Sequence, residues 1–132
     1  MILHGYTANT SKLCPRGWHV PTDAEWTVLT DYLTANGHNG TEGTALKATS
    51  GWNDYNGQSG NGTDDYGWLG LPGGSRSFNG NFYSIGNYGY WWSSSQDNTG
   101  RALYRNLHNI VDDVGRNDSS KESGFSVRCL RD

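Results

Sequence analysis

The sequence holds two strand-forming stretches in its last third, GYWWSSS at residues 89–95 and GFSVRCLRD at residues 124–132. In the second stretch Phe125, Val127 and Cys129 alternate with other residues, the period-two pattern of a half-buried strand. We expect this strand to be central in a sheet. Between the two stretches, residues 102–114 mix apolar side chains with Asn and Asp, which favour turns. This segment predicts short strands joined by polar turns.

The composition indicates a single domain, which we place at residues 1–132. Six Trp and eight Tyr compensate for a shortage of aliphatic side chains. The net charge of −3 comes from scattered residues of both signs, so nothing predicts nucleic-acid binding. No run of about 18 apolar residues predicts a membrane span, and no signal peptide is recognisable. Residues 1–13 predict an N-terminal strand or arm.

Cys14 and Cys129 are the only cysteines, and they lie near opposite ends of the chain. A pair placed in this way predicts a disulfide that ties the termini together, and two buried free thiols are the alternative. Because disulfides persist in oxidising compartments, the disulfide favours an extracellular or cell-surface location, or a phage particle.

The clearest helix pattern begins at Thr22, whose spacing from Glu25 matches a capping box. Trp26, Leu29 and Leu33 follow at helical spacing, so one face of this helix should pack on the core. We expect the helix to stop at the Asn-Gly pair that follows.

Weaker patterns lie downstream. They predict a second helix at 42–48, a long loop at 51–66, a short strand at 68–74 and a hairpin at 77–85. The combination predicts an α+β class, with two helices packed on short antiparallel strands and long loops. The predicted aromatic core contains Trp18, Trp26, Trp68, Trp91 and Trp92.

Several separated motifs resemble the Fibrobacter succinogenes major paralogous domain. They are CPRGWHVPTDAEW at 14–26, LKATSGW at 46–52, GNGTDDYG at 60–67, LPGGSR at 71–76, WWSS at 91–94 and GFSVRCLRD at 124–132. The resemblance implies a C-type-lectin-like fold, found on secreted and surface proteins of gut and rumen bacteria. It also implies that Cys14, before the first helix, pairs with Cys129 in the last strand.

The chain is also similar to the variable proteins of diversity-generating retroelements, in which adenine-directed mutagenesis rewrites the 3′ coding end. Asn codons and their one-base neighbours for Asp, Tyr, Ser, His, Thr and Gly then occupy exposed positions. Residues 76–122 resemble such a variable region. Its expected ligand-binding residues are Asn79, Asn81, Tyr83, Ser84, Asn87, Tyr88, Tyr90, Asp97, Asn98, Tyr104, Asn106, His108, Asn109, Asp112, Asp113, Asn117 and Asp118.

No pattern in the sequence predicts catalysis. The four His are dispersed without zinc-ligand spacing, and no Ser lies in a nucleophile motif. The acidic pairs Asp64-Asp65 and Asp112-Asp113 offer hard oxygen ligands, so a structural calcium ion is an alternative to solvated turns. No other cofactor is predicted, and the sugar-selecting tripeptides of calcium-dependent lectins are absent.

These observations predict a domain that binds rather than catalyses. We expect the ligand-binding or display domain of a retroelement variable protein, with a protein or glycan on another cell or surface as its partner. Tyr supplies rigid amphipathic contact area and Asn supplies adaptable hydrogen bonds, as in antibody loops. The alternative is a non-diversified cell-surface module for carbohydrate binding or structural adhesion.

Overall fold

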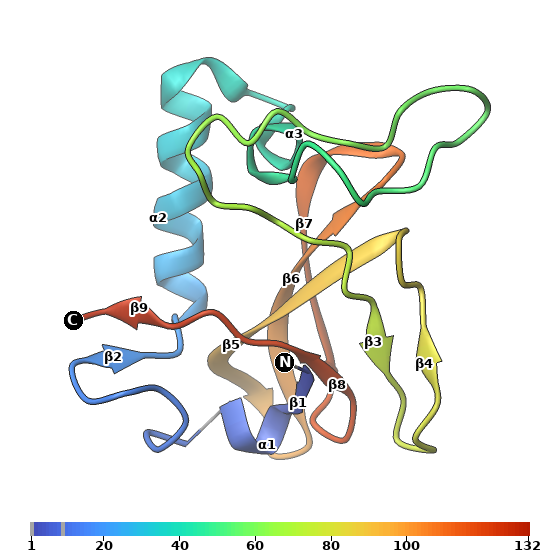
Figure 1. Cartoon of the computed structure of the whole chain (residues 1–132). Helices are drawn as coiled ribbons and strands as arrows, with labels where there is room; N and C mark the ends of the chain where they lie inside the picture. Colours follow the sequence, from blue (N-terminus) through green and yellow to red (C-terminus); the bar gives the residue numbers. More distant parts are fainter. Residues whose placement is uncertain (1, 9) are drawn as a thin grey trace.

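The computed structural model describes residues 2–8 and 10–132 and shows a domain built on one curled, mostly antiparallel sheet (Figure 1). Two positions of the predicted N-terminal arm, Met1 and Asn9, lie outside the described residues. Within the described part, the large sheet contains β1 Ile2–His4, β3 Ser75–Arg76, β4 Phe82–Tyr83, β5 Tyr88–Asn98, β6 Arg101–His108, β7 Val111–Ser120 and β8 Gly124–Ser126. The other elements are β2 Trp18–His19, which pairs with β9 Leu130–Arg131, and the helices α1 Gly5–Ala8, α2 Asp23–Leu33, η1 Thr34–His38 and α3 Glu42–Leu46.

The strand β8 is central, as predicted. The order along the sheet is β4-β3-β8-β5-β6-β7, and β1 also pairs with β8. The strand predicted through Cys129 is too long, because β8 ends at Ser126, although Phe125 and Val127 pack in the same core cluster, as the alternation predicts. Beyond it the chain leaves the sheet, and the Arg128 guanidinium lies over the Trp68 ring, 4.7 Å from its centroid.

The predicted α+β, C-type-lectin-like architecture is wrong for this chain. Helices make up only about 19% of it, and the molecule is mostly β-sheet rather than two helices packed on short strands. Residues 102–114, predicted as short strands joined by several turns, form parts of two long strands, β6 and β7, around one turn. Asn106, Asp112 and Asp113 lie within these strands as partly or fully exposed side chains, so their polar groups reach water and do not end the strands.

The predicted capping box at the start of α2 is confirmed. The Thr22 hydroxyl accepts from the Glu25 amide at 3.2 Å, and the Glu25 carboxylate accepts from the Thr22 amide at 2.8 Å. The backbone amide of Asp23, which has no partner within the helix, donates to the Ser95 hydroxyl at 2.9 Å. This bond fixes the start of α2 to β5. In Figure 1, α2 stands beside the sheet, and α3 lies with the long loop near one end of β7.

The core consists of two clusters on opposite sides of the sheet. One contains Trp26, Trp52, Trp91 and Leu107 and lies under α2 and α3, whereas the other gathers Trp92 and neighbours under α1. The predicted core is therefore right for three of its indoles, and Trp68 packs at its margin. Trp18 was wrongly placed there, because it lies in the small β2–β9 ribbon and is 45% exposed.

Two smaller predictions have different outcomes. The hairpin at 77–85 is confirmed in the β3–β4 pair, where Ser75 lies opposite Tyr83. The strand predicted at 68–74 is wrong, because this segment forms only isolated bridges, from Gly70 to Lys47 and from Gly74 to Gly89.

The predicted disulfide between Cys14 and Cys129 is confirmed, with Cα atoms 5.9 Å apart. It is consistent with an extracellular or otherwise oxidising location. Across residues 2–8 and 10–132, every helix is too short or too polar to cross a membrane.

Candidate ligand-binding face

Six of the predicted binding residues lie together on one side of β5, β6 and β7. In the strand register Tyr88 lies opposite His108, Tyr90 opposite Asn106, and Tyr104 opposite Asn117. Directly paired residues point to the same side of a sheet, and this side is turned away from α2. The name tyrosine face is used below for Tyr88, Tyr90, Tyr104, Asn106, His108 and Asn117.

The rings of the tyrosine face form a stacked row. The His108 and Tyr88 rings are 3.9 Å apart at an angle of 12°, and Tyr88 and Tyr90 are 5.3 Å apart at 10°. Tyr90 stacks in turn on Phe125 of β8 at 4.9 Å. Tyr104 meets Tyr90 edge-on at 5.7 Å. Tyr90 and Tyr104 also pack against the buried cluster around Trp92, so the row continues outward from the core.

The charged side chains of the same strands lie on the opposite side, toward α2. Arg105 and Arg116 both bind the carboxylate of Asp23, the Arg116 pair at 2.8 Å. Burial raises the pKa of Asp23, but hydrogen bonds from the two guanidinium groups outweigh it and hold the pKa below its usual value. Arg101 forms an ion pair with Asp118. The alternation of the strands thus separates charge from the tyrosine face.

The tyrosine face is uncharged at neutral pH. Burial raises the pKa of Tyr90 to about 12, while a hydrogen bond with Ser84 works against the shift. Burial also raises the pKa of Tyr104. The pKa of His108 is lowered, first by burial and second by the positive charge of Lys47. The phenols of Tyr90 and Tyr104 therefore stay protonated and the imidazole of His108 stays neutral, and Asn106 and Asn117 are amides.

Three more predicted residues border the tyrosine face. Ser84 hydrogen-bonds to Tyr90, and Asn87 lies just before β5 with its side chain bonded to Asn53 at 3.1 Å. Asn109 is only 8% exposed. Its side-chain amide donates to the Asn53 carbonyl at 3.0 Å and its backbone amide to the Asn87 carbonyl at 2.9 Å. Asn109 therefore has a structural role rather than a ligand-binding one.

The other predicted residues lie away from the tyrosine face. Their places are the β3–β4 hairpin for Asn79, Asn81 and Tyr83, the β5–β6 turn for Asp97 and Asn98, the flank of α3 for Asp112 and Asp113, and the α2 side of β7 for Asp118. The residues predicted as one surface thus divide into a compact group and a scattered remainder.

Two buried lysines hold the turns next to the tyrosine face. Lys47 is 2% exposed and donates to the carbonyls of His108 at 3.1 Å and Val111 at 3.2 Å, across the β6–β7 turn. Lys121 donates to the Gln96 side chain and to the Thr99 carbonyl, at the β5–β6 turn. The sequence analysis did not single out Lys47. The sequence does carry one signal for Lys47, because it is the only charged residue in the otherwise apolar segment 45–48.

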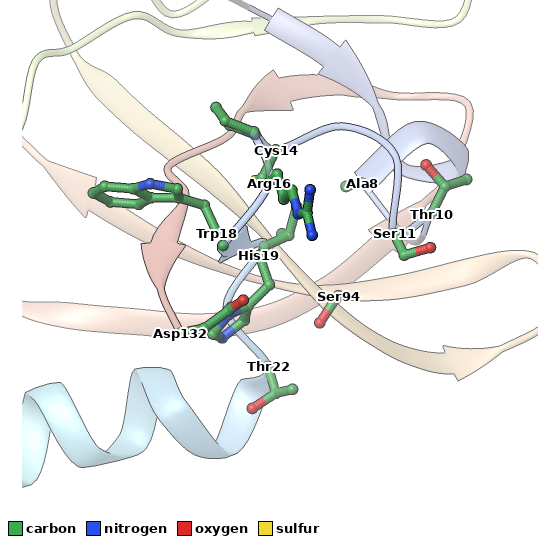
Figure 2. Close-up of a pocket in the computed structure, with 13 residues that line it drawn as sticks. Ala8, Thr10, Ser11, Cys14, Arg16, Trp18, His19, Thr22, Ser94 and Asp132 are labelled. Atoms are coloured by element: carbon green, nitrogen blue, oxygen red, sulfur yellow. The ribbon is translucent and has the colours of Figure 1, made fainter.

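A hollow of 520 Å³ lies under the N-terminal arm, apart from the tyrosine face (Figure 2). Its polar lining includes Arg16, His19 and Asp132. The imidazole of His19 binds Asp132 through Nδ1 at 2.6 Å and Glu25 through Nε2 at 3.0 Å. Because both ring nitrogens bond to carboxylates, this histidine offers no free nitrogen for general-base chemistry. Three further hollows, of 230, 470 and 380 Å³, likewise include no member of the tyrosine face.

In the acidic pairs considered for calcium, carboxylates accept hydrogen bonds from nearby groups of the protein. Asp64 accepts from the Leu69 amide at 2.7 Å, Asp112 accepts from the Thr44 hydroxyl at 2.9 Å, and Asp65 bonds to a nearby threonine. No cluster of three or more His, Cys, Asp or Glu suited to a metal ion occurs among residues 2–8 and 10–132. These carboxylates act as loop caps in the structure.

The fold and the face together define a disulfide-closed, β-rich domain with one uncharged aromatic surface. The sequence matches the Fibrobacter succinogenes major domain family (Fib_succ_major) over residues 3–131, and the chain belongs to this family. The family resemblance inferred from the sequence motifs is thereby confirmed. No curated protein and no solved structure matches the chain.

Proposed function

We propose that this chain is a ligand-binding display domain whose tyrosine face is the binding surface. We further propose that the face is diversified as in retroelement variable proteins. One observation carries the proposal: over residues 105–108 of β6, buried side chains alternate with partly exposed ones. Arg105 and Leu107 are buried on the side toward α2, and Asn106 and His108 are partly exposed on the other side.

The contacts that hold the β-turns support tolerance to substitution. Lys47 binds two backbone carbonyls beside the β6–β7 turn, and Lys121 binds a backbone carbonyl at the β5–β6 turn. These bonds do not depend on side chains of the tyrosine face. Members of that face that do not pack against the Trp92 cluster, such as Asn106 and Asn117, can therefore change while the strands keep their positions, which is the property that a variable binding surface needs.

Deep resequencing of the coding region in its source population tests the diversification. We expect substitutions at codons 88, 90, 104, 106, 108 and 117, with the buried Trp91, Arg105 and Leu107 held constant. Low and uniform variation would contradict diversification. The working description would then be a non-diversified surface module for carbohydrate binding or adhesion.

A separate experiment tests the binding role of the face. The partner is expected on another cell or surface, consistent with the disulfide and an oxidising location. Fluorescent domain should label cells of the source community, and the exposed substitution Asn117→Arg should reduce labelling at least tenfold. Equal labelling by the variant would exclude the tyrosine face as the binding surface.

A further inference from the structure

We propose that the partner of the tyrosine face is a folded protein surface of low charge rather than a glycan. This inference rests on the binding role proposed above and on no assumption about diversification. Ring geometry, charge and shape each contribute to it.

The ring geometry argues against sugar stacking. A pyranose ring binds an aromatic side chain by laying its C–H groups on the flat ring face. Tyr88 stacks on both His108 and Tyr90, and Tyr90 stacks on both Tyr88 and Phe125. These contacts use flat ring surface that a sugar would need for stacking.

The shape of the surface points the same way. Small ligands and glycan ends bind in concave sites, where most of their surface is buried. The four hollows described above contain no member of the tyrosine face. A partner that covers a broad sheet face, as protein partners do, would gain its contact area here without a deep pocket.

The charge of the face defines the partner's chemistry. Tyr90 and Tyr104 have raised pKa values and His108 a lowered one, so these three groups carry no charge at neutral pH. Ring edges, phenol hydroxyls and the amides of Asn106 and Asn117 suit an apolar patch edged with peptide groups or neutral polar side chains. A charged partner patch would lose hydration without gaining a counter-charge.

The test uses intact cells of the source community as the probe. The cells are presented to fluorescent domain untreated, after protease digestion, or after periodate oxidation, which cleaves vicinal diols of sugars. We expect protease to reduce labelling at least tenfold and periodate to change it less than twofold. Raising NaCl from about 0.05 to 0.5 M should also change it less than twofold, because no charge pair is expected to form.

Three variants accompany the wild type. Tyr88→Ser combined with His108→Ser removes one end of the ring row, and Asn117→Arg places charge on the face while leaving the row intact. Both should reduce labelling at least tenfold. Tyr32→Ser is the matched control, because Tyr32 is 54% exposed on α2, on the other side of the sheet, and should leave labelling unchanged.

Each outcome has a separate meaning. Labelling that survives protease and falls tenfold after periodate would overturn the protein partner, and so would competition by neutral hexasaccharides of glucose, xylose or mannose. A steep salt dependence would overturn the low charge of the partner. If Tyr32→Ser acts as strongly as Asn117→Arg, or if no cell is labelled, the proposed binding role of the face fails instead.

Discussion

The ammonium group of Lys47 lies 3.1 Å from the carbonyl oxygen of His108, a bond that joins the end of α3 to the β6–β7 hairpin. A second bond, to Val111 at 3.2 Å, completes the clamp. The chain uses a buried charge here to hold backbone groups, so the hairpin keeps its shape independently of the side chains that it presents.

Substitution Lys47→Met should destabilise the domain. Met retains most of the apolar stem, but two carbonyl groups lose a charged donor, and such bonds contribute about 1.5 to 3 kcal/mol. We expect the free energy of unfolding, measured by urea titration, to fall by about 2 kcal/mol. The exposed Lys12→Met serves as control and should change stability by less than about 0.5 kcal/mol. Equal stability of Lys47→Met and wild type would show that water replaces the ammonium group.

Reduction of the Cys14–Cys129 disulfide should have a larger effect. The two cysteines are 115 residues apart, so the bond closes almost the whole chain into a loop. In the chain-entropy account, opening such a loop costs about 4 to 5 kcal/mol. Urea unfolding of Cys14→Ser combined with Cys129→Ser, beside the wild type with and without reductant, measures the difference. A loss below about 1 kcal/mol would indicate that the reduced chain keeps its ends together by other contacts.

The two sides of the binding strands should differ in their tolerance to substitution. On the side toward α2 Trp91 is buried, and Trp91→Ala should cost about 3 to 5 kcal/mol. Asn106→Ser, on the tyrosine face, should cost no more than about 0.5 kcal/mol. Melting temperatures of the two variants give the comparison. A large shift for Asn106→Ser would contradict its assignment to a tolerant surface.

Tyr104 is expected to lie between these limits. The sequence placed it with the freely replaceable positions, but its ring packs edge-on against Phe125 at 4.9 Å and Trp92 at 6.2 Å. Truncation to Ser should therefore cost about 1 to 3 kcal/mol. Tyr104→Phe keeps the ring contacts and is the matched variant, with an expected change below about 0.5 kcal/mol.

Local patterns predicted local structure well. The Thr22–Glu25 capping box, the β3–β4 hairpin and the disulfide all depend on a few residues with strong geometric preferences, and all are present. The fold class failed, because Asn and Asp between residues 102 and 114 suggested turns. Their effect depends on whether the sheet leaves that face open to water, and a period-two pattern of polar residues alone does not reveal this.

The candidate site was predicted in part for the same reason. The expected ligand-binding residues included all six members of the tyrosine face, but no sequence pattern separated these six from the rest. The pairing of His108 with Tyr88 depends on the strand register. That register is set by the β5–β6 turn and by the shifts in pairing between Trp92 and Asn98. The contacts of Lys47 join residues about 60 positions apart. No local pattern specifies such a contact.

The pH dependence of stability should reveal the charge state of His19. Hydrogen bonds to Asp132 and then to Glu25 raise its pKa above the usual 6.5, so folding favours the protonated imidazole. The resulting stabilisation is fully present below pH 6.5, the value taken for the unfolded chain, and is lost as the pH rises through the higher pKa of the folded state. Glu25, whose pKa is lowered chiefly by the Thr22 amide, remains ionised across this window. The melting temperature of wild type should therefore exceed that of His19→Gln most at about pH 5.5 to 6, and the difference should shrink toward about pH 8 to 9.

Asp132→Asn removes the largest cause of the raised pKa of His19, so in that background the same His19 substitution should show a weaker pH dependence. A difference that stays constant from about pH 5.5 to 9 would mean that His19 contributes through neutral hydrogen bonds, with no linkage to protonation.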